Sequence, residues 1–263
     1  QILIIEWLQS VSTSCPPQWR NMGYLHQTIG IDARYTRQRN AWRPHLENSQ
    51  AFILKTAQSC KRRRKAVLMG AATLHDLPLE ALANLFEEIV LVDLFHLWSA
   101  RWLAFKNQNI TLNVCDLTAS LETIYSGDTT VHEPVEFLDD DDVDFVVSAN
   151  IASQLPLIPL DWLKGHFNID ARERQKFGEE IISAHFDYLD KFRATTCLIS
   201  DAERVALDKN GKAISRQPAL FGISPPPHQA SWEWDIAPYG ELNHQLATRH
   251  IVIAAILGQN SGT

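Results

Sequence analysis

Residues 65–93 constrain the fold of this chain more than any other stretch. A short apolar run at 66–69 stops at Gly70, and a second apolar run at 89–92 stops at Asp93. Short apolar runs bounded by turns are typical of parallel strands that are covered on both faces. The stretch therefore predicts two strands of a buried parallel sheet.

The segment between these two runs is typical of an amphipathic helix. Asp76 can cap such a helix, and Pro78 suits its first turn, where a missing N–H has little effect. Strand, helix and strand form a βαβ unit, the first half of a nucleotide-binding sheet. In such a unit a ligand approaches the turn at Gly70, and Asp93 reaches ribose hydroxyls. The helical pattern rests on four apolar residues: Leu79, Leu82, Leu85 and Phe86.

Further apolar runs at 110–115, 144–147 and 196–200 predict three more strands. Asp116 follows the first of them and a polar stretch at 148–156 follows the second, so both belong to the sheet edge where open α/β folds bind ligands. Helices are predicted at 94–107 and 178–192. Aromatic residues recur at helical spacing in the first of these helices and are predicted to pack in the core: Phe95, Trp98, Trp102 and Phe105.

Strands and helices alternate only as far as Asp201. A hairpin signal at 208–211 and apolar segments at 231–235 and 250–256 then follow without a helical pattern between them. The expected fold class is therefore α/β, a doubly wound Rossmann-like sheet that is mostly parallel and ends in an antiparallel edge strand.

Residues 1–64 precede the first sheet strand and are expected to form an N-terminal helical extension, with the Rossmann-like domain spanning 65–263. Residues 24–60 are predicted to be mostly helical, with a break near Arg43 and Pro44. A basic and aromatic cluster in this region is either a solvated face with Trp42 packed inward or a wall over the active site, with arginines that meet an anionic group. Its members are Arg34, Arg37, Arg39, Trp42, Arg43 and His45.

Composition limits the class of protein. With 263 residues, 45% of them hydrophobic, the chain can bury a full core, and its net charge of −7 argues against general affinity for nucleic acid. The four cysteines form no C-x-x-C pair, which indicates neither a disulfide framework nor a zinc site and suits a reducing cytoplasm. No apolar run reaches the roughly 20 residues that span a bilayer, and residues 1–8 lack the positive charge of a signal peptide. The expected localisation is cytoplasmic, with no membrane partner and no metal.

Four strand ends together resemble those of class I S-adenosylmethionine-dependent methyltransferases. VLMGAATL stands at the glycine-rich first motif of that family and VLVDL at its acidic ribose motif, NVCDLT at its adenine motif and DFVVSANIASQLP at its fourth-strand motif. The resemblance covers residues 65–256. Within the family, the run GAATLHDLPLEALANLF is similar to a divergent bacterial branch of methyltransferase-like proteins.

This resemblance implies a cofactor, a reaction and a set of contacts. The cofactor is S-adenosylmethionine, and the reaction is methyl transfer by in-line displacement to a substrate expected to be a small molecule. It assigns no catalytic base, and the candidates for one are His75, His96, Asp201 and His228. The residues implied to contact the cofactor are Gly70, Ala71, Asp93, Leu94, Asp116, Leu117, Ser148 and Asn150.

The first motif departs from the family pattern, because Gly70 is its single glycine and Leu74 and His75 fill space that glycine leaves open. This departure favours an alternative function, a catalytically inactive scaffold with a methyltransferase fold. The acids Asp93 and Asp116 favour the enzyme, since an acid at a strand end has little packing value without a ligand. A dinucleotide-dependent enzyme is disfavoured, because G-x-G-x-x-G is absent.

Overall fold

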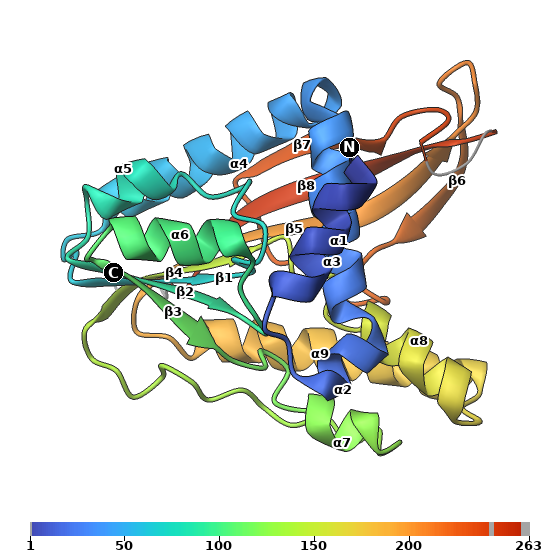
Figure 1. Cartoon of the computed structure of the whole chain (residues 1–263), viewed down its shortest axis with the longest axis horizontal. Helices are drawn as coiled ribbons and strands as arrows, with labels where there is room; N and C mark the ends of the chain where they lie inside the picture. Colours follow the sequence, from blue (N-terminus) through green and yellow to red (C-terminus); the bar gives the residue numbers. More distant parts are fainter. Residues whose placement is uncertain (1, 242–244, 259–263) are drawn as a thin grey trace.

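A mixed β-sheet runs through the computed structural model, which describes residues 2–241 and 245–258 (Figure 1). The strand order in the described part of the chain is β3-β2-β1-β4-β5-β8-β7, and β6 pairs with β5 outside this path. The strands are β1 (Lys65–Met69), β2 (Glu88–Asp93), β3 (Ile110–Val114), β4 (Val143–Ala149), β5 (Thr195–Leu207), β6 (Ala213–Pro218), β7 (Ala230–Ala237) and β8 (Ala247–Leu257).

The first five strands of this order are parallel, as each of the pairs β2–β3, β1–β2, β1–β4 and β4–β5 shows. Strand β8 runs antiparallel to both β5 and β7, and β6 runs antiparallel to β5. The antiparallel pairs therefore gather at one end of the sheet. The predicted fold class, a mostly parallel doubly wound sheet with an antiparallel edge, is confirmed.

Helices cover both faces of the sheet. Figure 1 shows α4, α5 and α6 on one side and α9 on the other. The strand β1 packs toward both layers, with Leu68 in the apolar cluster of Ile53 and Val67 in the cluster of Tyr188. The helices are α1 (Ile2–Ser12), α2 (Pro17–Met22), α3 (Tyr24–Arg37), α4 (Arg39–Ser59), α5 (Leu79–Ala83), α6 (Trp98–Lys106), α7 (Leu121–Tyr125), α8 (Leu157–His166) and α9 (Ala171–Asp190).

The helix predicted after β1 is shorter than expected. Helix α5 has five residues, Pro78 occupies its N-cap position, and no side chain caps it. The prediction that Asp76 caps this helix is wrong, because the Asp76 carboxylate bonds instead to His45 of α4. The loop between β1 and α5 is correspondingly long, and it borders the cavity described below.

The aromatic residues of α6 do not pack in the core as predicted. Phe95 precedes the helix and is buried, whereas Trp98, Trp102 and Phe105 are 62%, 44% and 81% exposed. The core face of α6 carries smaller side chains, such as Ala100. The three exposed rings stack on one another along the outer face, so their helical spacing marks the solvent side of the helix.

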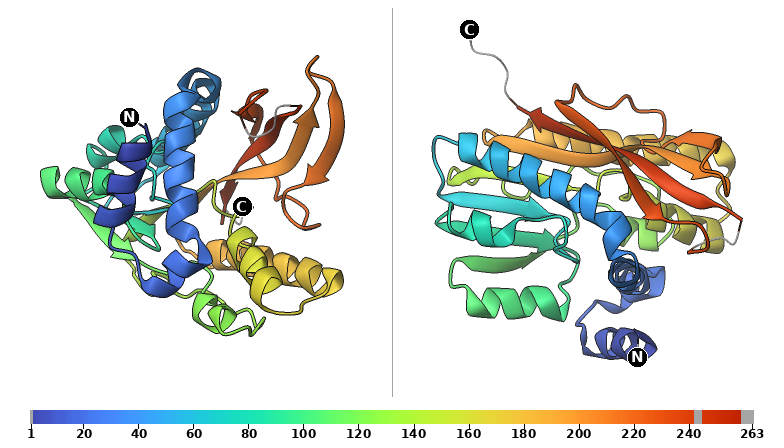
Figure 2. Two further views of the ribbon diagram at one scale, coloured as in Figure 1. Left: turned by 45° about the vertical axis from the view of Figure 1, so that its right-hand side comes forward. Right: turned by 90° about the horizontal axis from the view of Figure 1, so that it is seen from above.

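The predicted helices of the N-terminal region are present, but the break lies at Gln38 instead of at Arg43 and Pro44. Pro44 falls inside α4, which lies across the sheet against β7 (Figure 2). Trp42 and Ile53 of α4 belong to the same apolar cluster as Leu68 of β1. The division into 1–64 and 65–263 remains a prediction.

Candidate functional site

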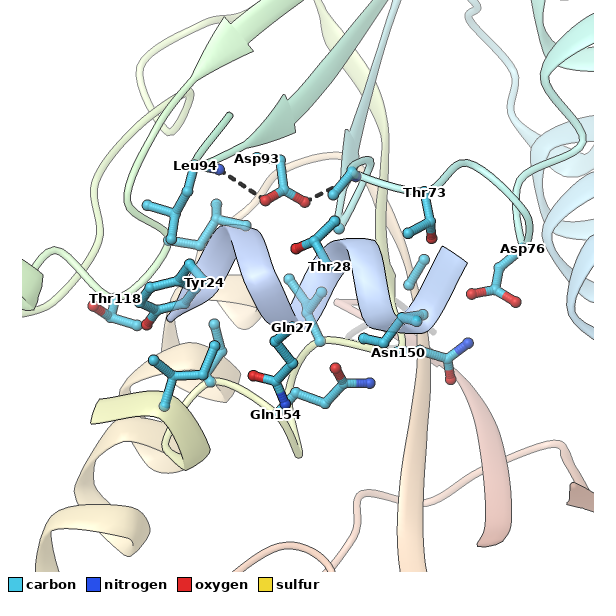
Figure 3. Close-up of a pocket in the computed structure, with 18 of the residues that line it drawn as sticks. Tyr24, Gln27, Thr28, Thr73, Asp76, Asp93, Leu94, Thr118, Asn150 and Gln154 are labelled. Carbon is cyan, nitrogen blue, oxygen red and sulfur yellow. Dashed lines mark hydrogen bonds between the residues drawn. The ribbon is translucent and has the colours of Figure 1, made fainter. Parts of the chain in front are cut away.

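A cavity of about 1040 Å³, including its open mouth, lies at the carboxyl edge of the parallel strands. Loops after β1, β2, β3 and β4 form its floor, and α3 passes across its front (Figure 3). Ligands of open α/β sheets bind at this edge, outside the carboxyl ends of the strands. Among the described residues, no group of three metal-ligating side chains converges there or elsewhere.

The turn after β1 requires glycine because of its backbone conformation and its close packing. Gly70 has a φ of +86°, and a Cβ atom on it would lie 2.5 Å from Ile151 Cγ2 and 2.6 Å from the Ala149 carbonyl oxygen. The Gly70 backbone N–H donates to the Val92 carbonyl at 3.1 Å, which closes the turn against β2. Gly70 lines the cavity, whereas the Ala71 side chain is fully buried beneath it.

Asp93 stands at the end of β2 with its carboxylate at the cavity. Its two oxygens accept hydrogen bonds from the backbone N–H groups of Ala72, at 3.0 Å, and of Leu94, at 2.8 Å (Figure 3). Burial raises the pKa of Asp93 to about 6, and the two backbone hydrogen bonds act in the opposite direction. Each oxygen retains a second lone pair, so this carboxylate can also accept hydrogen bonds from a ligand.

Asp116 organises the loop after β3. Its carboxylate accepts hydrogen bonds from the Thr118 N–H at 2.8 Å, from the Thr118 hydroxyl at 2.7 Å and from the Leu121 N–H at 2.8 Å. These bonds fix the loop at the start of α7. Leu94, Asp116 and Leu117 all line the cavity, as the predicted contacts require.

The two predicted residues at the end of β4, Ser148 inside the strand and Asn150 just after it, lie in different places. Asn150 lines the cavity and adopts a φ of +55°, a left-handed conformation that asparagine tolerates. Ser148 is buried in the core, with its Oγ 2.9 Å from Nε2 of His185, and is not part of the cavity wall. Burial lowers the pKa of His185 to about 4, which keeps this pair neutral. The cofactor contact predicted for Ser148 remains a prediction that this geometry does not support.

The four candidates for a catalytic base lie in different parts of the structure. His75 alone among them lines the cavity, with Nε2 2.9 Å from Asp32 Oδ1. His96 is buried and donates from Nε2 to the Asn113 carbonyl, Asp201 is buried beside His250, and His228 is exposed in a loop. Only His75 therefore has a position from which it could touch a ligand in this cavity.

Helix α3 supplies a wall that the sequence did not assign. Tyr24, Gln27, Thr28 and Ile31 face the cavity from one side of the helix. Burial raises the pKa of the Tyr24 phenol well above its usual value, and the nearby carboxylates of Asp116 and Asp93 add to this effect. Trp42 packs in the apolar core at 3% exposure and also lines the cavity, so the interpretation of the cluster at residues 34–45 as a solvated face with Trp42 packed inward fits the structure better than the wall interpretation. The arginines do not face the cavity; Arg37 pairs with Glu241 at 2.6 Å.

A second carboxylate borders the cavity beside Asn150. Asp76 accepts a hydrogen bond on Oδ1 from His45 Nε2 at 3.1 Å. The Asn150 side-chain amide approaches the same His45 nitrogen to 3.2 Å, and Trp232 Nε1 donates to His45 Nδ1 at 3.0 Å. Residues from α4, β7 and two strand-end loops therefore meet at this point.

No protein-family model matches the sequence, and no curated protein does. Among solved structures, the chain is similar to a DhpI-SAH complex and to a DhpI-SAM-HEP complex, each with 11% identity and a TM-score of 0.36. These alignments cover 86% of this chain and 94% and 95% of the respective DhpI chains. A third similar structure is the 23S rRNA methyltransferase ErmE, with 11% identity, a TM-score of 0.29 and coverage of 80% of this chain and 70% of that chain.

Within the described residues, no helix combines the length and apolarity needed to cross a membrane.

Proposed function

We propose that this chain is an S-adenosylmethionine-dependent methyltransferase that acts on a small molecule. The observation that carries the proposal is the position of Asp93: a carboxylate at the end of β2, one strand from the Gly70 turn, on the wall of a cavity. An acid at this position of an open α/β sheet hydrogen-bonds the hydroxyls of a ribose. The sequence motifs that resemble the methyltransferase family lie around the same cavity.

The residues present fit a nucleoside cofactor. Loops from four strand ends line the cavity at the sheet edge where open α/β folds bind nucleosides. Asn150 Oδ1 is buried without a hydrogen-bond partner among the described residues, so it can accept a hydrogen bond from a ligand. Leu94 and Leu117 line the same cavity as the two carboxylates and offer apolar surface suited to an adenine base.

The role of the chain in the reaction is binding and alignment. S-adenosylmethionine supplies a methyl group that its sulfonium activates. Asp93 and the turn at Gly70 would hold the cofactor, while α3, through Tyr24 and Ile31, would exclude water from the cavity. Holding two reactants in line can lower the barrier of such a displacement by about 7–11 kcal/mol.

The small-molecule assignment is supported by the way the cavity is covered. Helix α3 lies across its front, and Trp42 of α4 and Trp234 of β7 line its wall. A cavity bounded on several sides in this way favours a compact substrate over a polymer. The net charge of −7 also disfavours general attraction to nucleic acid.

Titration calorimetry with S-adenosylhomocysteine and, separately, with NAD tests the proposal. Saturable binding of S-adenosylhomocysteine together with no binding of NAD is the expected result. Binding of neither compound would contradict the proposal and shift the assignment to the scaffold alternative. Binding of NAD alone would assign the cavity to a different class of enzyme.

A further inference from the structure

The Asp76 carboxylate has no role in the cofactor contacts proposed above, yet it is held in a defined position at the cavity. It lies in the loop between β1 and α5, and its side chain is 20% exposed. In Figure 3, Asp76 lies with Thr73 and Asn150 on the opposite side of the cavity from Leu94 and Thr118. It therefore borders a part of the cavity that is separate from the adenine and ribose contacts expected near Asp116 and Asp93.

His45 fixes the orientation of this carboxylate. An indole N–H is only a donor, so the 3.0 Å hydrogen bond from Trp232 Nε1 leaves His45 Nδ1 unprotonated in the neutral ring. The proton is then on Nε2, which donates to Asp76 at 3.1 Å. The His45 ring is fully buried and stacks on Trp234 with 3.9 Å between ring centroids. His45 is thus a positioning residue for Asp76.

Asp76 is ionised at neutral pH. Burial alone would raise its pKa, but the hydrogen-bonding and charge interactions with His45, the hydrogen bond from Asn150 and the nearby His75 together hold the pKa below its usual value. In the part of the chain that the structure describes, neither a lysine nor an arginine forms an ion pair with Asp76. Its negative charge is therefore available to a cation that enters the cavity.

Aromatic rings complete this part of the site. Trp42 and Trp234 line the same cavity and pack edge to face, with 4.9 Å between ring centroids. The two indole rings offer apolar surface, and the Asp76 carboxylate offers a charge-assisted hydrogen bond. Together these groups suit an organic amine with an apolar body.

We infer that Asp76 binds the amino group of the methyl acceptor, and hence that the substrate is a small amine. This inference rests on the proposed methyltransferase function and names its substrate class. Asp76 is then the residue that contacts the nucleophile, and His45 acts through Asp76.

The chemistry balances without a further reactant. Before α3 closes off water, the ammonium gives up one proton to solvent at the open mouth of the cavity. The neutral nitrogen then forms a bond to the methyl carbon as the bond between that carbon and sulfur breaks. The electron pair of the broken bond stays on sulfur, which becomes a neutral thioether. The positive charge appears on nitrogen beside Asp76, whose carboxylate stabilises it more in the transition state than before attack.

A pair of probes that differ in one group tests this inference. The whole protein is saturated with S-adenosylhomocysteine and titrated with 2-phenylethylamine or with 2-phenylethanol, and both Kd values are measured by calorimetry. We expect the amine to bind at least about tenfold more tightly than the alcohol, because a hydrogen bond to a charged group contributes roughly that ratio.

The ratio of the two Kd values should fall to near one in Asp76→Asn and should drop in His45→Phe, which keeps the aromatic stack. Asp140→Asn, which alters a carboxylate paired with Lys65 outside the cavity, should keep the wild-type ratio.

Each outcome separates the inference from the function on which it rests. If the wild-type protein does not bind S-adenosylhomocysteine, the proposed function fails and the inference falls with it. If S-adenosylhomocysteine binds but the amine does not bind, or binds no better than the alcohol, the amine assignment is overturned. An unchanged ratio in both Asp76→Asn and His45→Phe would overturn the role of Asp76 even if amines are preferred.

Discussion

The carboxylate of Asp93 accepts a 3.0 Å hydrogen bond from the backbone N–H of Ala72, so that one side chain joins the loop after β1 to the end of β2. The same carboxylate accepts the Leu94 N–H with its other oxygen. Asp93 therefore shapes the cavity floor in addition to facing the cavity. Substitutions at this position affect both stability and the proposed binding, and the first two predictions separate these effects.

The Asp93→Asn variant should bind S-adenosylhomocysteine about 10- to 100-fold more weakly than the wild-type protein, because a hydrogen bond to a charged group contributes about 1.5–3 kcal/mol. The amide keeps the size of the side chain, so the fold should be retained. Calorimetric Kd values and a circular dichroism spectrum of each protein provide the check. Equal affinities in the two proteins would show that Asp93 does not contact the cofactor.

The raised pKa of Asp93, about 6, predicts a specific pH dependence of stability. An unfolded aspartate has a pKa of about 3.9. Between that pH and about 6, Asp93 therefore holds a proton in the folded state that it has lost in the unfolded state. The contribution of Asp93 to the free energy of unfolding therefore falls as pH rises through this window. Urea unfolding at about pH 4 and pH 7 should show a larger loss of stability for the wild-type protein than for Asp93→Asn. Parallel pH profiles of the two proteins would contradict the raised pKa.

Gly70→Ala should destabilise the protein by about 2–4 kcal/mol, through a left-handed backbone conformation and an overpacked Cβ. The Cβ atom would meet Ile151 and the Ala149 carbonyl oxygen. Gly165→Ala is the matched control, because no atom lies within 4 Å of its added Cβ and the residue is helical. Chemical denaturation of both variants checks this expectation, and a Gly70→Ala protein as stable as the control would contradict the geometry of the turn.

The exposed rings of α6 predict a contrast between two phenylalanines. Phe105→Ser should change the free energy of unfolding by no more than about 0.5 kcal/mol, because surface substitutions away from special features stay within that range. Phe95→Ala should lower it by about 3–5 kcal/mol, because it leaves a cavity in the core. Phe105 is 81% exposed and Phe95 is 2% exposed. Similar losses in the free energy of unfolding of the two variants would support the prediction that all four aromatic residues pack in the core.

Tyr24→Ala should weaken the binding of S-adenosylhomocysteine, because it removes an aromatic side chain from the cavity wall near Asp116. The expected loss is about tenfold or more, comparable to the 1–3 kcal/mol of an aromatic ring stacked on a base. His26→Ala, on the exposed side of the same helix, serves as the control. A Tyr24→Ala protein with wild-type affinity would show that α3 lies outside the binding site.

Much of the sheet follows directly from local sequence. The apolar runs that became β1 and β2 are buried on both faces, so hydrophobicity alone marks them. Asp93 and Asp116 both line the cavity, as expected from the rule that the carboxyl ends of parallel strands share one edge. Ser148 shows the limit of this reasoning, because it lies within β4, where successive residues face opposite sides of the sheet, and its side chain contacts the buried His185 and not the cavity.

The parts that the sequence did not predict depend on contacts between distant segments. Asp76 has the residue type and position of a helix cap, and only the packing of α4 against β7 brings His45, 31 residues earlier in the chain, to its carboxylate. Tyr24 reaches the cavity for the same kind of reason, because α3 crosses the edge of a sheet whose strands come later in sequence. Periodicity specifies that a segment is helical, but it does not specify which element the helix covers.

A structure of the protein crystallised with S-adenosylhomocysteine tests the central claim most directly. The account predicts electron density for the ligand in the cavity, with the ribose hydroxyls within hydrogen-bond distance of the Asp93 carboxylate and the sulfur directed toward the side of the cavity that holds Asp76. Density for the ligand at another surface, or a ribose that makes no contact with Asp93, would contradict the account.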